Sequence, residues 1–396
     1  MIKRLTLAVA AFAISTAALA DDVVKIGMLQ GFTGPTESLV APMVKGGDLA
    51  IKEVSDSGLF LGGKKVVSVH GDSTCTDAAA ATAAAERLVT SEKVSAINGA
   101  TCSGATTAVL NNVAIPNGIV MISPSATSPA LSTMKDNGLF FRTAPSDARQ
   151  GQVLADILKR RGIKTAAVTY TNNDYGKGLA DSFTAAYKKD GGKVTIVAAH
   201  EDGKADYSAE VAALAAAGGD VLVVVGYLDQ GGRGIIQSSL DSGAFKTFVL
   251  PDGMVGPSLT DHFGTAINGS FGTHPGSDSP GQKMMVKLAQ GIGLKGSESY
   301  VPECYDASAL ILLGMQAAGS TESSKLKDTI MKVANAPGEK IYPGQLAKGL
   351  KILADGGDID YVGGSDVELV GSGEAAGSYR EVEVKNGKFE TVMYHH

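Results

Sequence analysis

Residues 165–199 read TAAVTYTNNDYGKGLADSFTAAYKKDGGKVTIVAA, and this stretch decides the fold. TAAVTY at 165–170 and VTIVAA at 194–199 are short apolar runs typical of strands, and residues 176–190 between them have helical composition. A helix that connects two apolar strands predicts that the strands lie parallel in one sheet. The stretch therefore predicts an α/β fold.

The same alternation of strand and helix extends in both directions and forms two series, one before residue 145 and one after it. Such sheets are parallel, carry helices on both faces and bind ligands at the carboxyl ends of their strands. We expect two sheets, with YREVEV and KFETVMY near the C-terminus added to one of them as antiparallel strands. The other expected strands are VVKIGML (23–29), KKVVSVHG (64–71), VSAING (94–99), GIVMIS (118–123), a short strand around 140–143, VLVVVG (221–226) and TFVL (247–250).

Composition and charge exclude several classes of protein. The 396 residues are 44% hydrophobic and 19% charged, which is the balance of a chain that folds around a core. With 41 acidic and 35 basic residues the net charge is −6, and the one basic cluster, at 159–161, is expected at the C-terminal end of a helix. We therefore expect no nucleic-acid partner.

The first twenty residues predict a secretory signal peptide. Lys3 and Arg4 precede an uncharged apolar stretch, and Ala18-Leu19-Ala20 before Asp21 fits the rule for cleavage after small residues. The alternative is an N-terminal membrane anchor, but the stretch is shorter than the roughly 20 apolar residues that a span needs. We expect the protein to be exported, with residues 1–20 removed.

Export changes the interpretation of the three cysteines, because an exported protein meets an oxidising compartment. Cys75 and Cys102 flank one strand-helix-strand stretch, and a bridge across their 27-residue separation would stabilise the fold by about 3.5 kcal/mol. We predict that these two cysteines form a disulfide. Cys304 is then unpaired, and we expect it to pack as a small apolar residue.

Motifs that carry enzyme chemistry are incomplete or missing. Residues 58–64 spell G-x-x-x-x-G-K, but Lys65 replaces the required hydroxyl and a strand follows, so we expect a hairpin-like connection there. The histidines have no metal-binding spacing, and His200 and His274 are expected at the surface or in loops. No G-x-G-x-x-G, H-E-x-x-H or G-x-S-x-G motif is present. We expect no metal, no cofactor and no enzymatic activity.

Small polar residues recur where strands end. Ser103 follows the strand at 94–99 and is expected to be the N-cap of the next helix, and Ser125 and Thr127 follow the strand at 118–123. In the second series Tyr175, Tyr227 and Asp252 occupy the corresponding loops. Hydroxyls and helix amides on one side would hold a carboxylate, and Asp252 on the other would hold an ammonium group. The set predicts a site for a zwitterionic α-amino acid.

Several segments together resemble the periplasmic solute-binding proteins of branched-chain amino acid ABC transporters. These segments are KIGMLQGFTGPTESL, CSGATTAV, VMISPSATSPALS, FFRTAPSD, YTNNDYGKGLADSF, VVVGYLDQ, VLPDGM and YDASALILLGMQAAGS, and they span most of the chain. The resemblance implies two Rossmann-like lobes with parallel-sheet cores, joined by a three-crossover hinge. It places 22–145 plus 275–374 in the N-terminal lobe and 146–274 plus 375–396 in the C-terminal lobe.

The resemblance also implies roles for individual residues. Ser103 and Thr127 would bind the ligand carboxylate, the backbone at Ser125 and the Asp252 side chain would bind its ammonium group, and Tyr175 and Tyr227 would close the cleft. The implied ligand-binding set further includes Leu39, Ala126 and Cys102, and the resemblance supports the bridge between Cys75 and Cys102. It implies a monomer that delivers an amino acid to the transmembrane subunits of an ABC permease.

Two departures from the family leave the ligand's side chain open. Leu39 stands where relatives often carry an aromatic residue, and Asp252 is one methylene shorter than the glutamate of leucine-binding relatives. Glu37 and Glu303 would admit a polar ligand if they reach the site, and would otherwise be solvated. The alternatives are the same fold with another small carboxylate, amide or urea-like ligand, a ligand sensor that feeds a signalling partner, and an exported enzyme.

Overall fold

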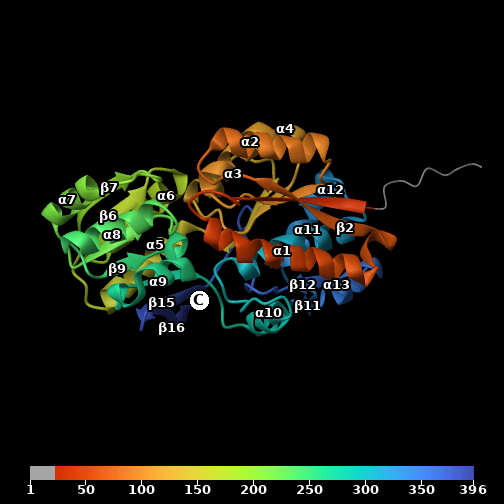
Figure 1. Ribbon diagram of the computed structural model, residues 1–396. Coiled ribbons are helices and arrows are strands. Elements are labelled where there is room, and N and C mark those ends of the chain that lie inside the picture. Colours follow the sequence, from red (N-terminus) through yellow and green to blue (C-terminus); the bar gives the residue numbers. More distant parts are fainter. Residues whose placement is uncertain (1–22) are drawn as a thin grey trace, which may run out of the picture.

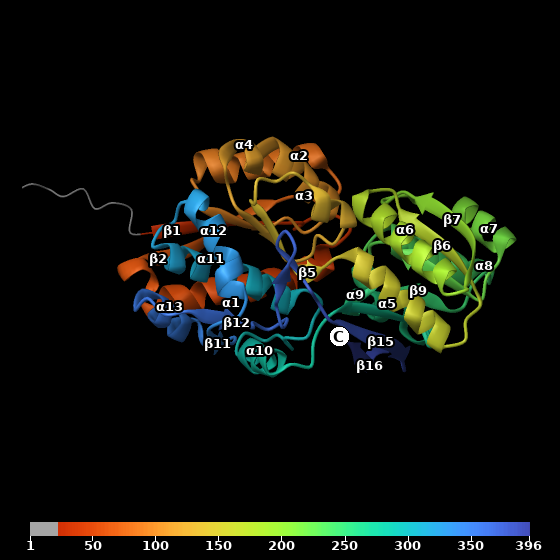
Figure 2. The ribbon, with the colours of Figure 1, turned by 180° about the vertical axis from the view of Figure 1, so that it is seen from behind.

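The computed structural model of the protein describes residues 23–396, so the predicted signal peptide at 1–20 lies outside the described residues. Two seven-stranded sheets lie side by side, each with helices packed around it (Figure 1). The view from behind shows the same division, with α1 to α4 and α11 to α13 around one sheet and α5 to α9 around the other (Figure 2). The predicted α/β architecture with two sheets is confirmed.

The first sheet has the strand order β13-β14-β5-β4-β3-β1-β2. Its first five strands in sequence are all parallel to their neighbours, and β13 and β14 form an antiparallel pair at one edge. The strands are β1 (Val23–Gln30), β2 (Lys65–Asp72), β3 (Ala96–Gly99), β4 (Met121–Ser123), β5 (Phe140–Pro145), β13 (Leu369–Val370) and β14 (Glu374–Ala375).

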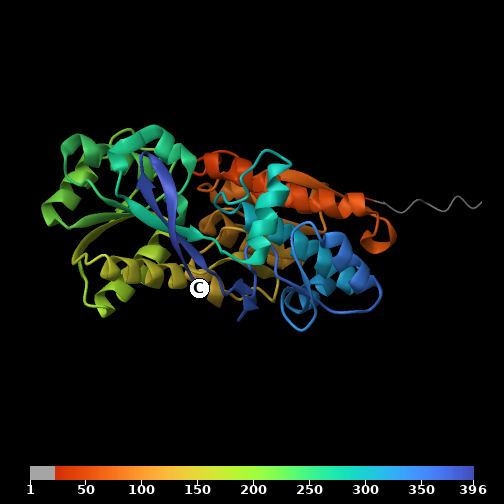
Figure 3. The same cartoon turned by 90° about the horizontal axis from the view of Figure 1, so that it is seen from below.

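The second sheet has the order β16-β15-β10-β9-β8-β6-β7. Strands β6 to β10 are parallel, and β15 and β16 add to β10 as an antiparallel pair, as predicted (Figure 3). The strands are β6 (Thr165–Thr171), β7 (Lys193–His200), β8 (Val221–Val225), β9 (Phe248–Leu250), β10 (Phe271–Pro275), β15 (Tyr379–Lys385) and β16 (Lys388–His395). Sequence patterns predicted every strand of this sheet except β10.

The helices follow the strands in the expected alternation. They are α1 (Glu37–Ser57), α2 (Ala78–Glu86), α3 (Ser103–Val109), α4 (Ile115–Asn117), α5 (Asp147–Arg160), α6 (Asp174–Lys189), α7 (Ser208–Ala217), α8 (Gly231–Ser242), α9 (Pro257–Phe263), α10 (Pro280–Gln290), α11 (Val301–Ala318), α12 (Ser323–Ala334) and α13 (Leu346–Ala354). Helix α11 is buried from Val301 to Gln316 and is apolar on most sides, because it packs against α1, α12 and the first sheet. A small parallel pair, β11 (Glu339–Ile341) and β12 (Ile359–Tyr361), lies beside α13.

The chain passes between the two sheets three times. The passages follow β5, β10 and β14, so residues that are distant in sequence share one sheet. The exact lobe boundaries, at 145, 274 and 374, stay a prediction. Within residues 23–396, no helix combines the length and the apolar character that a membrane span requires.

The segment 58–64 differs from expectation. A short 3-10 helix, Phe60–Gly62, links α1 to β2 there, and β2 runs parallel to β1. A hairpin would join antiparallel neighbours, so the expected hairpin-like connection is wrong. The segment is instead the helix-to-strand turn of a βαβ unit.

The basic cluster at 159–161 does end a helix, since α5 stops at Arg160. Its arginines also contact the C-terminal strands: Arg161 Nη2 lies 2.8 Å from Glu381 Oε1, and Arg160 pairs with the same carboxylate. Glu381 is buried in β15, and its arginine and histidine partners hold the pKa of the carboxyl below its usual range despite burial. The cluster therefore anchors the antiparallel strands to α5.

His200 and His274 are buried rather than exposed, which corrects the expectation for both. His200 ends β7 and pairs with the Thr169 hydroxyl (2.8 Å to Nδ1), and burial lowers its pKa to about 4. His274 lies in β10, the strand that sequence patterns missed, and receives a hydrogen bond from Arg380 (2.8 Å). Each histidine is buried because it belongs to a strand of the second sheet. A single polar residue in the sequence does not indicate such a buried position.

The predicted disulfide between Cys75 and Cys102 is present. It joins the loop after β2 to the residue before α3. Cys304 is a free cysteine, fully buried in α11, with its Sγ 3.7 Å from Asn98 Oδ1. Its surroundings agree with the packing role expected for it.

Candidate functional site

A cavity lies where the carboxyl ends of strands from both sheets meet. Its empty volume is about 360 Å³, part of which is open to solvent. Its walls come from the first-sheet loops on one side and the second-sheet loops on the other. The lining residues are Thr36, Leu39, Met43, Thr101, Cys102, Ser103, Ser125, Tyr175, Tyr227, Asp252, Gly253 and Tyr300.

Thr101 is positioned by the end of β3. Gly99 ends this strand with φ +145°, and a Cβ there would come within 2.2 Å of Leu29 O, so only glycine fits. Beyond it, Thr101 Oγ1 donates to Gln30 Oε1 (2.7 Å) and accepts from the N–H of Gly31 (3.0 Å). These bonds fix the threonine between the ends of β1 and β3.

Ser103 is the first residue of α3, and Cys102 is the N-cap, so the predicted capping role of Ser103 is wrong by one position. Its side chain turns away from its own helix amides, and its Oγ accepts from the N–H of Ser128 (3.1 Å). Ser103 is 1% exposed and lines the cavity. The serine therefore joins the start of α3 to the loop that follows β4.

The loop after β4 holds three residues predicted to bind ligand. Ser125 lines the cavity, and its Oγ donates to Thr101 O (2.8 Å). The N–H of Ala126 is occupied by Ser123 Oγ (2.9 Å), and Thr127 is fully buried, with no hydrogen-bond partner for Oγ1 among residues 23–396. Ala126 and Thr127 lie outside the cavity lining.

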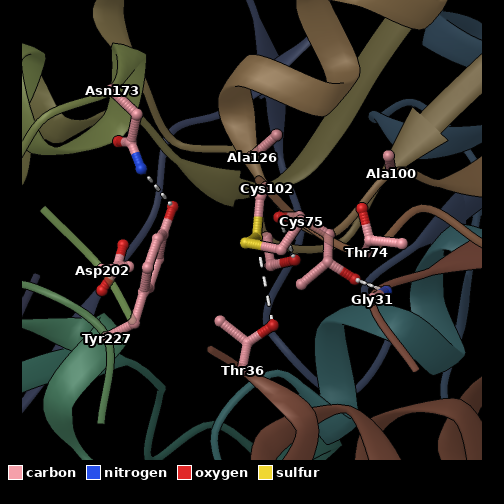
Figure 4. Close-up of a disulfide and its surroundings, with 12 residues drawn as sticks. Gly31, Thr36, Thr74, Cys75, Ala100, Cys102, Ala126, Asn173, Asp202 and Tyr227 are labelled. Carbon is pink, nitrogen blue, oxygen red and sulfur yellow. Dashed lines mark hydrogen bonds between the residues drawn. A yellow bond between two sulfur atoms is a disulfide. The ribbon is translucent and has the colours of Figure 1, made fainter. Parts of the chain in front are cut away.

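The disulfide lies at the edge of the first face of the cavity, which carries Thr101, Ser103 and Ser125. Cys102 lines the cavity, and its Sγ lies 4.0 Å from Thr36 Oγ1. Figure 4 shows the bridge and Thr36 on one side of an open space, with Tyr227 and Asn173 on the other. A covalent bond therefore ties Cys102, a residue of the cavity lining, to the loop after β2.

Tyrosines surround a single carboxylate on the second face. Tyr175 and Tyr227 stack with ring centroids 5.3 Å apart. Tyr175 Oη donates to Asp252 Oδ1 (2.8 Å), and the hydroxyl of Tyr300, which precedes α11, donates to Asp252 Oδ2. Asn173 Nδ2 donates to Tyr227 Oη (3.5 Å). Asp252 is thus held by hydroxyls from both sides of the cavity.

Gly253 permits this close arrangement. A Cβ at this position would come within 2.6 Å of Gly226 O and 2.9 Å of Tyr175 Oη. The N–H of Gly253 donates to Tyr175 Oη (3.3 Å), so the backbone itself helps to orient the ring. Any larger residue would displace Tyr175 or the loop after β8.

Burial dominates the electrostatics of the second face. It raises the pKa of Asp252, against the opposing effect of the Tyr300 and Tyr175 hydroxyls. Burial also raises the pKa of Asp147, the first residue of α5, and the nearby charge of Asp252 raises it further. Neither carboxyl oxygen of Asp147 has a hydrogen-bond partner among residues 23–396. Asp252 is the one carboxyl group in the cavity lining, and the lining contains no Lys, Arg or His side chain.

Apolar side chains close the remaining wall. Leu39 and Met43, on the first two turns of α1, line the cavity, and Leu39 belongs to the same buried cluster as Leu228, Met254 and other residues of the second sheet's loops. Glu37 is exposed on α1, outside the lining. Glu303 also lies outside it: the side chain is buried, its Oε2 has no partner among the described residues, and burial raises its pKa to about 8.

Seven of the nine predicted ligand-binding residues line the cavity, and Ala126 and Thr127 do not. Their contact with a ligand stays a prediction. Sequence reasoning missed five lining residues: Thr36, Met43, Thr101, Gly253 and Tyr300. Thr36 and Thr101 follow strand ends and could have been found by the rule that identified Ser103. Tyr300 follows no strand and carries no such signal.

The arrangement suits reversible binding. Uncharged hydroxyls face a buried carboxylate across an enclosed space with an apolar wall. Among residues 23–396, no group of three or more His, Cys, Asp or Glu side chains is placed to hold a metal ion. The site offers the Ser103 hydroxyl as a donor at one end and the Asp252 carboxyl at the other.

Comparisons with known proteins agree on the family. Residues 23–342 match the family described as periplasmic binding protein. The "Leu/Ile/Val-binding protein homolog 3" of Brucella melitensis is 30% identical over 78% of this chain and 83% of its own length. Among solved structures, a leucine binding protein from Thermotoga maritima has the same fold, with a TM-score of 0.79, 24% identity and coverage of 94% of this chain and 98% of that chain.

A branched-chain amino acid transporter substrate binding protein from Streptococcus pneumoniae, solved in complex with isoleucine, also has this fold. Its TM-score is 0.75 at 24% identity, and the match covers 93% of this chain and 99% of that chain. By sequence and by fold, the chain belongs to the periplasmic binding protein family, a family of solute-binding proteins.

Proposed function

We propose that this protein is the solute-binding component of an ABC importer and binds a branched-chain or related amino acid in the cavity between its two sheets. The relatives named above for leucine, isoleucine and valine support this proposal. Binding involves no chemical conversion: the lobes close around the ligand and present it to the membrane permease.

The observation that carries the proposal is the polarity of the cavity. Asp252 is a buried carboxylate with no cation beside it in the lining, and it faces Thr101, Ser103 and Ser125 across the cavity. A ligand ammonium group would pair with Asp252, and a ligand carboxylate would accept a hydrogen bond from the hydroxyl of Ser103, because those of Thr101 and Ser125 donate within the protein. Leu39 and Met43 offer an apolar surface for an aliphatic side chain.

The proposal extends to location and partners. The family implies a periplasmic location, and we propose that the signal peptide at 1–20 is cleaved after Ala20. We further propose that the protein acts as a monomer and that its partners are the transmembrane subunits of an ABC permease.

A thermal-shift screen tests the proposal. Purified protein, unfolded and refolded to remove any carried ligand, is heated with each amino acid and with benzoate, acetamide and urea. A ligand at a hundredfold excess over Kd adds about 2.7 kcal/mol to the free energy of unfolding, which raises Tm. We expect the largest increase with leucine, isoleucine or valine, confirmed by titration calorimetry.

The matched variant is Asp252→Asn, which keeps the shape of the side chain and removes its charge. We expect this variant to lose the shift with amino acids. A shift with benzoate, acetamide or urea and none with any amino acid would replace the amino-acid proposal with the alternative of a simple carboxylate or amide ligand.

A further inference from the structure

Asp229 makes hydrogen bonds across the edge of the cleft between the two sheets. It lies in the loop between β8 and α8, on the second-sheet side. Its Oδ2 accepts from the N–H of Ser38 (2.9 Å), and its own N–H donates to Pro35 O (3.3 Å). Ser38 is in the first turn of α1, which packs on the first sheet, and Pro35 immediately precedes the N-cap of that helix. One residue of the second lobe therefore makes two hydrogen bonds to the first.

The bond to Ser38 is a helix cap supplied from the other lobe. The N-cap of α1 is Thr36, whose side chain makes no capping hydrogen bond. Ser38 is the second residue of the helix, and its N–H is one of the donors that a capping side chain normally satisfies. The carboxylate of Asp229 also places a negative charge at the positive end of a 21-residue helix.

Asp229 is held in this position from its own side as well. Its Oδ1 accepts from Ser258 Oγ in α9 (2.8 Å), and its carbonyl oxygen accepts from Arg233 Nη2 (2.8 Å). These two bonds help to fix the Asp229 carboxylate in the orientation in which it accepts a hydrogen bond from α1. It is partly exposed and does not line the ligand cavity.

The cap sits beside a tightly packed contact between the lobes. Leu39, next to Ser38, packs against Leu228 and Val255 in the same buried cluster. A Cβ on Gly256 would lie 2.9 Å from Leu39 Cδ2, so little space remains there. Ser299 Oγ donates to Val255 O (2.8 Å) at the same contact. The hydrogen bond between Asp229 and Ser38 lies at the polar edge of this apolar contact. The apolar contact is made only while the lobes are together.

We propose that Asp229 is a latch residue: it caps α1 across the cleft only in the closed form and so raises ligand affinity without touching the ligand. The inference rests on the proposed function, in which the lobes close around an amino acid. When the lobes separate, the Ser38 N–H and the Asp229 carboxylate return to water and their bond is lost. Because the bond stabilises the closed form alone, it increases the fraction of protein that is competent to hold ligand.

The test compares Asp229→Ala with a matched control, Asp206→Ala. Asp206 makes a similar pair of bonds, from Ser208 N and Ser208 Oγ (both 2.9 Å), but within one lobe, at the start of α7. By titration calorimetry with L-leucine, we expect Asp229→Ala to weaken binding about tenfold, about 1.4 kcal/mol. Asp206→Ala should bind as the wild type does. Asp229→Asn, which still accepts a hydrogen bond, should recover part of the loss.

Hydrogen exchange adds a readout that a general loss of stability would not produce. In L-leucine-saturated protein, the first turn of α1 should exchange faster in Asp229→Ala than in the wild type, whereas the exchange of α7 should change only in Asp206→Ala. Equal L-leucine affinity in the wild type and Asp229→Ala would overturn the latch.

Small-angle X-ray scattering separates the failure of the latch from the failure of the proposed function. If the wild type binds no amino acid, the proposed function fails, but ligand-free samples still test Asp229. The latch predicts a larger radius of gyration for Asp229→Ala than for Asp206→Ala and the wild type. Equal radii for the three proteins would reject it.

Discussion

The two faces of the ligand cavity hold their polar groups by different means. On the first face, Thr101, Ser103 and Ser125 bond to backbone atoms or to buried side chains, and the bridge at Cys102 adds a covalent tie. On the second face, Asp252 is held by tyrosine hydroxyls, one of which comes from the opposite side. The first face thus carries uncharged groups that are held by bonds within the protein. The second face carries a carboxylate whose hydrogen bonds to tyrosine hydroxyls a ligand can replace.

This difference predicts where mutations act. Substitutions on the first face should reduce the stability of the fold more than they reduce ligand affinity, because the hydrogen bonds of this face are made within the protein. Changes to Asp252 should reduce affinity most, because its carboxylate has no cationic partner in the cavity until a ligand arrives.

Removal of the bridge should give the largest loss of stability. The double variant Cys75→Ser with Cys102→Ser should lower the free energy of unfolding by about 3.5 kcal/mol, because the unfolded chain regains the entropy that the crosslink removes. Denaturant unfolding measures the loss, and reduction of the wild type with a thiol reagent should reproduce it. A loss below about 1 kcal/mol would show that the first face does not depend on its covalent tie.

Asp252→Ala should give the largest loss of affinity. An amino-acid ammonium group would lose its only buried anion in the cavity lining, so we expect L-leucine binding to weaken at least about 100-fold, about 2.7 kcal/mol. Titration calorimetry measures the change. The thermal stability of the ligand-free Asp252→Ala variant should stay close to that of the wild type or rise, because a buried carboxylate is removed. Affinity within twofold of the wild type would contradict the role of the second face.

Acidification should weaken binding through the same carboxyl. Burial raises the pKa of Asp252 in the free protein, and the ligand ammonium group pairs with the ionised form only. Affinity for L-leucine should therefore fall as pH drops through that pKa, by up to about tenfold per pH unit. Calorimetry in two buffers of different ionisation enthalpy should detect proton release on binding, and Asp252→Asn should abolish it.

The stability of the ligand-free protein should show the opposite trend. Because the pKa of Asp252 is higher in the folded than in the unfolded state, its contribution to stability is present at low pH and is lost as pH rises through the folded value. Thermal unfolding without ligand, compared with Asp252→Asn, measures this slope. Stability from Asp252 that increased with pH would contradict the raised pKa.

Ser103→Ala should have an intermediate effect. The variant leaves the N–H of Ser128 without its partner and removes one hydroxyl from the first face, so we expect about a fivefold loss of L-leucine affinity, close to 1 kcal/mol. Ser242→Ala is a suitable control, because the Ser242 hydroxyl bonds to Ser238 O on an exposed part of α8. Equal affinities of the two variants would remove Ser103 from the ligand set.

Tyr227→Phe should have the smallest effect. The hydroxyl receives only a long bond from Asn173 (3.5 Å), and the variant keeps the ring that stacks on Tyr175. We expect less than about a threefold change in L-leucine affinity and less than about 0.5 kcal/mol in stability. A larger loss of affinity would indicate that this hydroxyl bonds to the ligand.

Much of the fold follows from local sequence patterns. Apolar runs such as VLVVVG identify strands because both faces of a parallel sheet are covered, and the helices follow from the intervening composition. Strand β10, FGTHP, was missed because Gly, Thr, His and Pro interrupt its apolar pattern. The same gap explains the wrong expectation for His274, which looked like a loop residue only because its strand was not recognised.

The candidate site was predictable where it follows strand ends. Ser103, Ser125, Tyr175, Tyr227 and Asp252 all come shortly after a strand, and parallel strands bring those positions to one edge. Ser103 was misplaced by one residue as a cap, because an N-cap is set by backbone conformation at Cys102 rather than by the presence of a hydroxyl.

Local sequence patterns are enough to predict the alternation of strands and helices, the disulfide between Cys75 and Cys102 and the polar residues at strand ends. Each of these follows from local patterns or from spacing along the chain. Two long-range contacts become visible only in the folded protein: Tyr300 donates to Asp252, 48 residues away, and Asp229 caps α1 at Ser38, 191 residues away. These contacts depend on how the two lobes pack, and no local periodicity or composition records that packing.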